Sequence, residues 1–173
     1  MKNNIVLIGM PGSGKSTIGV LLAKYIGYDF IDSDLLIQSR EGKKLYEIIR
    51  EKGLDEFDRI ENEVNASIKA KNTVIATGGS VVYGKEAMAH LKEIGTVVYL
   101  SVPLHELEKR INNMATRGIS IKEGQTFEDL YNERVVLYEK YCDIKVDCIH
   151  ESLSKNADEV AKILGFDKSY SLG

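Results

Sequence analysis

The sequence predicts an α/β fold in which a parallel sheet is covered by helices on both faces. Short apolar, β-branched runs alternate along the chain with stretches of helical spacing, a pattern typical of βαβ units. The runs "IVLI" and "VVYL" are almost continuously apolar, as expected for strands that are buried on both faces. A glycine-rich loop separates the first apolar run from the first helical pattern, which marks the first βα unit.

The strands are predicted from five apolar runs. These are "NIVLIG" at 4–9, "YDFID" at 28–32, "NTVIATGG" at 72–79, "TVVYLSV" at 96–102 and "DIKVDC" at 143–148. Apolar residues at helical spacing between these runs predict the helices. The predicted helices are 15–26, 34–52 with a break near Gly42, 54–70, 85–94, 104–112, 127–141 and 156–164.

The segment 112–126, "NNMATRGISIKEGQT", has no clear periodicity. A loop of this length inside a compact domain is usually functional or disordered, and we predict a mobile lid. A chain of 173 residues suggests one domain, which we place at 1–165, followed by a flexible tail at 166–173.

The composition is that of an ordinary soluble protein, with 43% hydrophobic and 28% charged residues. A net charge of −3 argues against a nucleic-acid or membrane surface. We expect Cys142 and Cys148 to be reduced thiols, since two cysteines are too few for a disulfide framework. The apolar run Ile5–Ile8 is too short for a signal peptide, so we expect a cytoplasmic protein. We also expect it to be a monomer that acts on a small molecule.

The strongest motif is a phosphate-binding loop. Gly9, Gly14, Lys15 and Ser16 fill every fixed position of G-x-x-x-x-G-K-[ST]. In such a loop, backbone N–H groups surround the phosphates, the lysine reaches the β- and γ-phosphates, and the hydroxyl joins the Mg²⁺ shell. The alternative, a glycine-rich turn without a ligand, is disfavoured because a full match between a strand and a helix is rare by chance. The residues expected to bind the nucleotide here are Gly12, Ser13, Gly14, Lys15, Ser16 and Thr17.

Residues after the second and third strands predict the acceptor side of the site. The absence of N-K-x-D disfavours a GTPase, so we expect ATP as the nucleotide. Asp32 and Asp34 lie where a strand meets a helix, at the edge of the sheet where ligands bind in open α/β folds. We expect Asp32 to hold Mg²⁺ and Asp34 to take a hydroxyl proton; the alternative is that Asp34 only caps the helix. Gly78 and Gly79 permit close approach of the backbone to a ligand.

Charged residues interrupt the apolar stripes of two helices. Arg134 falls inside the stripe of 127–141 and is expected to grip a carboxylate; the alternative is an internal salt bridge. On 54–70, Glu61 lies within the stripe and Asp58 at its edge, while Arg59 points to the opposite side.

Two arginines accompany the predicted lid. We expect Arg110 to contact the nucleotide and Arg117 to offset charge in the transition state. The alternative for both is that they are solvated.

Together these motifs resemble the shikimate kinase family. The matching elements are "GMPGSGKSTIG", "FIDSD", "ATGG", the basic lid and "ERVVLYEKY", in the family's order over nearly the whole chain. The resemblance implies a three-layer P-loop kinase fold with a five-stranded parallel sheet, ATP and Mg²⁺ as cofactors, and phosphorylation of shikimate to shikimate 3-phosphate in aromatic amino acid biosynthesis. It also implies that Lys15, Asp34 and Arg117 are catalytic, that Ser16 and Asp32 hold the metal, and that Asp34, Asp58, Gly78, Gly79 and Arg134 surround the acceptor.

Three positions depart from the family pattern. Asp58 stands where G-E-x-x-F-R-x-x-E has its arginine, Ser80 replaces a third glycine after "ATGG", and "RGIS" at 117–120 replaces R-P-L-L. Two like charges ~4 Å apart repel by about 4 kcal/mol at an effective dielectric of 20, so an aspartate beside a carboxylate opposes binding. This leaves open a kinase of another polyhydroxylated, amine-bearing metabolite. A regulatory ATP-binding module without catalysis is a further alternative.

Overall fold

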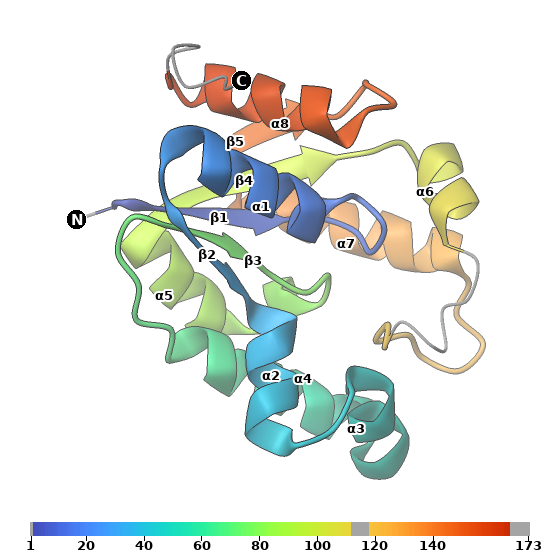
Figure 1. The fold of residues 1–173 in the computed structure, drawn as a ribbon. Helices are drawn as coiled ribbons and strands as arrows, with labels where there is room; N and C mark the ends of the chain where they lie inside the picture. The colour runs from blue at the N-terminus through green and yellow to red at the C-terminus, as the bar shows by residue number, and fades with distance from the viewer. Residues whose placement is uncertain (1, 112–117, 167–173) are drawn as a thin grey trace.

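Five parallel strands form one sheet in the order β2-β3-β1-β4-β5, which confirms the predicted α/β class (Figure 1). The structure is a computed structural model, and it describes residues 2–111 and 118–166. The strands are β1 (Asn4–Ile8), β2 (Asp29–Asp32), β3 (Thr73–Ala76), β4 (Gly95–Ser101) and β5 (Ile144–Asp147). The central strand β1 is buried throughout and pairs through Val6 with Ile75 of β3 and Val97 of β4.

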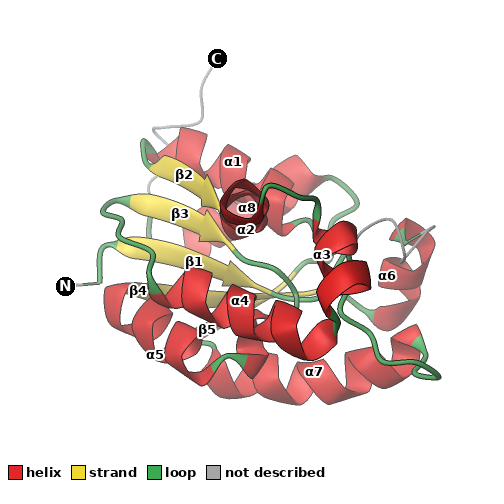
Figure 2. Cartoon of the chain, turned by 90° about the horizontal axis from the view of Figure 1, so that it is seen from below, coloured by secondary structure: helices red, strands yellow, loops and turns green. Residues whose placement is uncertain are grey.

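Helices cover both faces of the sheet, so that the fold has three layers. On one face α1 (Lys15–Ile26) packs beside α8 (Leu153–Ile163). On the other face lie α5 (Lys85–Ile94) and α7 (Phe127–Tyr141), with α4 (Leu54–Ala66) packed beside α5 (Figure 2). Two short elements follow strands: the 3₁₀ helix η1 (Val81–Tyr83) after β3, and α6 (Leu104–Arg110) after β4.

Between β2 and β3 the chain builds a small helical lobe from α2 (Ser33–Glu41), α3 (Leu45–Lys52) and α4. Gly42 ends α2 in the left-handed conformation, which confirms the predicted break in 34–52. The lobe has its own apolar cluster, distinct from the core around the sheet, made of Ile37, Leu45, Ile48, Phe57, Ile60 and Val64. Because α2 starts directly where β2 ends, this cluster stands beside the carboxyl edge of the sheet.

Two predicted helix boundaries were wrong by three or more residues, and side-chain hydrogen bonds explain both. The helix predicted over 54–70 ends at Ala66, where Ser67 Oγ donates to the carbonyl of Val64 at 2.8 Å. The helix predicted to begin at residue 156 begins at Leu153, capped by the Ser152 hydroxyl. Asn156 resembles a helix cap in the sequence, but its side chain is buried and pairs with the backbone of His150. Its Oδ1 accepts from the His150 N–H, and its Nδ2 donates to the His150 carbonyl.

No helix in the described ranges 2–111 and 118–166 is long and apolar enough to cross a membrane. Cys142 and Cys148 are free thiols, as predicted. Of the predicted tail, Phe166 packs edge-on against Tyr28, and residues 167–173 lie outside the described part of the chain.

Candidate active site

The loop between β1 and α1 is organised around Lys15. The Lys15 ammonium donates to the carbonyl of Gly9 at 2.7 Å and to that of Met10 at 2.8 Å, and more weakly to Ser13 Oγ at 3.4 Å. Burial lowers the pKa of Lys15 to about 8, while the negative charge of Asp34 acts in the opposite direction. A desolvated cation at the N-terminus of a helix is the expected partner for a phosphate chain.

Ser16 and Asp32 lie together beside this loop. Ser16 Oγ donates to Asp32 Oδ2 at 2.8 Å, and Asp32 Oδ1 accepts from the backbone N–H of Asp34. Asp32, and not Asp34, is therefore the N-cap of α2. No group of three or more metal-binding side chains occurs in the part of the chain that the structure describes. Nucleotide-bound Mg²⁺ takes most of its ligands from phosphates and water, and the protein contributes only one or two oxygens. The Ser16 hydroxyl and the Asp32 carboxylate are suitable for this role.

Asp34 faces the end of β3 across a very short gap. A Cβ added to Gly78 would lie 2.7 Å from Asp34 Oδ1 and 2.6 Å from Glu61 Oε2. Glycine leaves room for both carboxyl groups, since an added Cβ would require each of them to shift. Burial and the neighbouring charge of Asp32 raise the pKa of Asp34 to about 6, and Lys15 partly offsets the rise. A carboxylate with such a pKa is ionised at pH 7 and poised to accept a proton.

Glu61 comes from α4 and is almost fully buried, at 2% exposure. Its Oε1 accepts a hydrogen bond from the Ser80 hydroxyl, and its Oε2 has no partner among the described residues. Burial raises the pKa of Glu61 to about 8; the Ser80 bond acts against this rise, and the charge of Asp34 adds to it. At pH 7 the Glu61 carboxyl is therefore mainly protonated. Ser80, which departs from the family glycine, supplies the hydrogen bond that this carboxyl group receives among the described residues.

Arg134 comes from α7 and is 1% exposed. Its Nη2 donates to the carbonyl of Ser120 at 2.7 Å, its guanidinium lies over the ring of Tyr83, and its Nε has no partner in the described ranges. A Cβ on Gly79 would come within 2.8 Å of Arg134 Nη1. No carboxylate among the described residues lies within 4 Å of this guanidinium, so the salt bridge weighed as its alternative role is absent from that part of the structure.

Asp58 and Arg59 point in different directions from α4. Asp58 Oδ1 accepts a hydrogen bond from Ser120 Oγ at 3.3 Å. Partial burial raises the pKa of the Asp58 carboxyl, and the Ser120 bond and the charge of Arg134 act against that rise. Arg59 lies on the exposed side of the helix, where it pairs with Glu56 and Glu63. Its direction agrees with the one that the helical period predicts.

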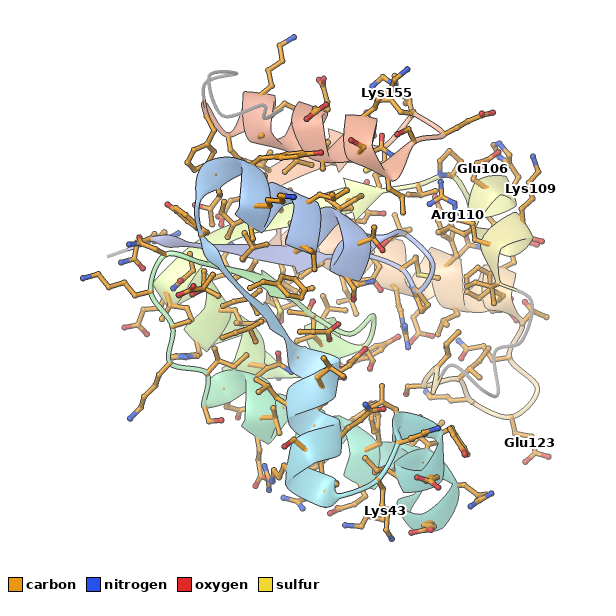
Figure 3. All side chains as sticks on the ribbon, viewed as in Figure 1. Lys43, Glu106, Lys109, Arg110, Glu123 and Lys155 are labelled. Atoms are coloured by element: carbon orange, nitrogen blue, oxygen red, sulfur yellow. The ribbon has the colours of Figure 1, made fainter. Side chains whose placement is uncertain are left out.

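Arg110 ends α6 next to the phosphate loop (Figure 3). Its Nη1 donates to the carbonyl of Gly12 at 3.1 Å. The side chain of Ile111, the next residue, also packs against the loop: a Cβ added to Gly12 would lie 3.1 Å from Ile111 Cγ1. Arg117, the other arginine predicted for the lid, lies outside the described residues.

A single cavity of about 420 Å³ joins these parts. Of the predicted residues, it is lined by Gly12, Gly14, Lys15, Ser16, Thr17, Asp34, Gly78, Gly79, Arg110 and Arg134. Ser13, Asp32 and Asp58 are not among its lining residues; each reaches it through a hydrogen bond to a residue that is. The site therefore places the glycine-rich loop with Lys15, the carboxyl group of Asp34 and the buried guanidinium of Arg134 around one space.

The cavity also has walls that the sequence analysis did not identify. These are Pro11, Leu45, Phe57, Thr77, Gly118, Ile119 and Ser120, and Glu61 and Ser80 line the cavity as well. The helical period places Glu61 on the same side of 54–70 as Asp58, and in the structure Glu61 lines the cavity whereas Asp58 does not. Ser120 belongs to the departing segment "RGIS", but the sequence does not place it in the cavity, because it reaches the cavity through the path of a loop.

Comparisons with known proteins agree with this geometry. The family model for shikimate kinase matches residues 11–165. A shikimate kinase of Clostridium botulinum is 44% identical over 153 residues, covering 86% of this chain and 89% of that protein. A shikimate kinase of Persephonella marina is 35% identical over 158 residues, covering 91% of this chain and 96% of that protein.

The fold comparison points the same way. The structure of a shikimate kinase from Acinetobacter baumannii in complex with shikimate superimposes with a TM-score of 0.84 at 29% identity, covering 100% of this chain and 97% of that one. A family model that matches residues 11–165 leaves little of the chain unmatched. The chain therefore belongs to the shikimate kinase family and is a phosphotransferase with an alcohol group as acceptor.

Proposed function

We propose that this protein transfers the γ-phosphoryl group of ATP to a hydroxyl of shikimate, with Mg²⁺ bound to the nucleotide. The observation that carries the proposal is Arg134. A guanidinium that is 1% exposed and has no anion within reach in the described structure is costly to bury. It faces the same cavity as Lys15 and Asp34. A carboxylate on the acceptor would complete this site, and shikimate carries both a carboxylate and hydroxyls.

Each residue then has a role that follows from its position. The backbone of the phosphate loop and Lys15 would hold the β- and γ-phosphates, and Arg110 would border the nucleotide beside Gly12. When bound, Mg²⁺ neutralises charge on the phosphate oxygens, with Ser16 and Asp32 as its protein oxygens. Asp34 would accept the proton of the attacking hydroxyl, and Gly78 and Gly79 would let the acceptor approach the backbone. Little covalent chemistry is required, because positioning and charge stabilisation dominate phosphoryl transfer.

The electrostatics of the acceptor side favour an acid over an amine. An amine-bearing acceptor would be favoured by ionised carboxylates at Asp58 and Glu61 in addition to Asp34. Glu61 is mainly neutral at pH 7, since burial raises its pKa to about 8, and Asp58 does not line the cavity. Of the ionised groups that line the acceptor side, Arg134 is the cation that suits an acid, and Asp34 is the carboxylate assigned to the acceptor's hydroxyl.

The test compares shikimate with its methyl ester in a coupled assay of ADP release. We expect saturable turnover of shikimate, and a KM for the ester at least about tenfold higher, because the ester cannot accept a charge-assisted bidentate hydrogen bond. In Arg134→Gln this preference for the acid should disappear, while the KM for ATP stays within about twofold. Failure of the wild-type protein to phosphorylate shikimate, or equal use of acid and ester, would contradict the proposal.

We further propose that the protein works as a monomer in the cytoplasm. The free thiols of Cys142 and Cys148 support a reducing compartment. Sedimentation at micromolar concentration, with and without nucleotide, tests the monomer.

A further inference from the structure

Ser120 is held by two helices that both border the acceptor side of the cavity. Its hydroxyl donates to Asp58 Oδ1 on α4 at 3.3 Å, and its carbonyl accepts from Arg134 Nη2 on α7 at 2.7 Å. One residue therefore stands between a carboxylate and the guanidinium that faces the acceptor. The Ser120 carbonyl accepts a hydrogen bond from one nitrogen of the planar Arg134 guanidinium. The position of this carbonyl therefore influences how the other guanidinium nitrogens face the cavity.

The segment that carries Ser120 is seated on a third helix as well. Gly118 has a φ of +67°, and a Cβ there would lie 2.5 Å from Leu45 Cβ and 3.1 Å from the backbone nitrogen of Tyr46. The chain can pass this close to the start of α3 only with glycine. Gly118, Ile119 and Ser120 all line the cavity. This 118–120 segment is thus fixed at one end by close packing and at the other by hydrogen bonds.

We propose that Asp58 and Ser120 are a pair of positioning residues for the acceptor: the Asp58 carboxylate anchors the Ser120 hydroxyl, and the Ser120 carbonyl orients Arg134 toward the acceptor's carboxylate. The inference rests on the proposed function, and it assigns to Asp58 an indirect role in place of direct contact with the acceptor. The negative charge of Asp58 is directed to the lid segment and is separated from the acceptor by Ser120. An aspartate at this position is then compatible with an anionic acceptor.

The kinetic test is a double-mutant cycle of Asp58→Ala and Ser120→Ala, assayed with shikimate and ATP. Each single variant should raise the KM for shikimate about fivefold, the factor expected when one hydrogen bond is lost. The KM for ATP and kcat should stay within about twofold, because Lys15 and Asp34 are untouched. The double variant should match the singles, since both remove the same bond.

Conservative variants separate positioning from general damage to the fold. Asp58→Asn keeps an oxygen that can accept the Ser120 hydroxyl bond, and Ser120→Thr keeps the hydroxyl, so both should stay near the wild-type KM. Asp55→Asn is the matched control, because Asp55 is exposed and lies one turn earlier on α4. Independent, multiplicative effects of the two alanine variants, or a rise in the KM for ATP equal to that for shikimate, would overturn the proposal.

A second measurement needs no acceptor and so does not depend on the proposed function. Lys122 is exposed two residues after Ser120, and trypsin cleavage after it can be followed by mass spectrometry. Asp58→Ala, Ser120→Ala and the double variant should be cleaved several-fold faster than the wild type, to the same extent. Ser154→Ala, on α8 across the sheet, should be cleaved as the wild type is. Unchanged cleavage in both single variants would refute the anchoring, whereas loss of shikimate turnover in the wild type alone would refute only the acceptor.

Discussion

Replacing Glu61 with glutamine tests the electrostatics of the acceptor pocket through stability rather than activity. Glutamine has nearly the same shape, and its oxygen can still accept the hydrogen bond from the Ser80 hydroxyl. The substitution therefore removes mainly the ability to ionise. Burial raises the pKa of the Glu61 carboxyl from the ordinary 4.5 to about 8. The folded protein keeps this proton at pH 7, and the unfolded chain releases it.

The sign of the effect follows from this difference in bound protons. Between about pH 5 and pH 8 the native state holds one more proton at this position than the unfolded state does, so stability falls as pH rises. The slope approaches about 1.4 kcal/mol per pH unit, and the whole shift corresponds to roughly 5 kcal/mol once the carboxyl is ionised. The Glu61→Gln variant lacks this loss. Its stability relative to the wild type should therefore increase steadily from pH 5 to pH 8.

Urea denaturation at pH 5, 6, 7 and 8 measures the difference. Subtracting the variant's stability from that of the wild type cancels the titration of the groups that do not interact with Glu61. Glu63→Gln is the matched control, because Glu63 is exposed on the same helix and its pKa is lowered by a hydrogen bond to Arg40. Its difference from the wild type should be flat above pH 6. Parallel curves for the wild type and Glu61→Gln would refute the conclusion that Glu61 is protonated at pH 7.

Two further predictions concern the residues around Gly78. Because the pKa of Asp34 is raised to about 6, kcat/KM for shikimate should fall about tenfold per pH unit below pH 6. In addition, Asp34→Asn should lower kcat at least about a hundredfold, while calorimetry still detects binding of an ATP analogue. A profile that is flat down to pH 5 would exclude Asp34 as the base. Gly78→Ala should cost about 1–3 kcal/mol of stability and raise the KM for shikimate, since its Cβ would lie within 2.7 Å of Asp34 and Glu61. Wild-type stability and KM in this variant would show that the two carboxyl groups can move apart.

The sheet and the nucleotide side of the site were accessible to sequence reasoning because they depend on local patterns. Alternating apolar runs and helical spacing predicted the five strands, and the structure has a strand within each of the five runs. The motif from Gly9 to Ser16 predicted a strand–loop–helix unit, which the structure contains. Boundaries failed where a side chain bonded to the backbone, as at Ser67 and Asn156, because such bonds compete with helical ones and leave no periodic signal.

The acceptor side was less accessible. The sequence showed that Asp58, Glu61 and Arg134 share the apolar sides of two helices, but not what each of them contacts. The bond between Asp58 and Ser120 joins residues 62 positions apart, through a loop that has no secondary-structure pattern. Charge counted along the sequence treated Asp58 and Glu61 alike, whereas the structure buries Glu61 almost completely and leaves Asp58 half-buried beside a hydroxyl.

By itself, then, the sequence determined the layered α/β class, the phosphate loop and the position of Asp34 after a strand end, since each follows from neighbours in the chain. The tertiary structure alone decided the protonation of Glu61, the absence of an ion pair at Arg134 within the described residues, and the place of Ser120 between two helices. The physical reason is that desolvation and hydrogen bonding depend on which groups the folded chain brings within a few ångströms. Those distances are set by the packing of separate elements, and residue type and spacing do not encode them individually.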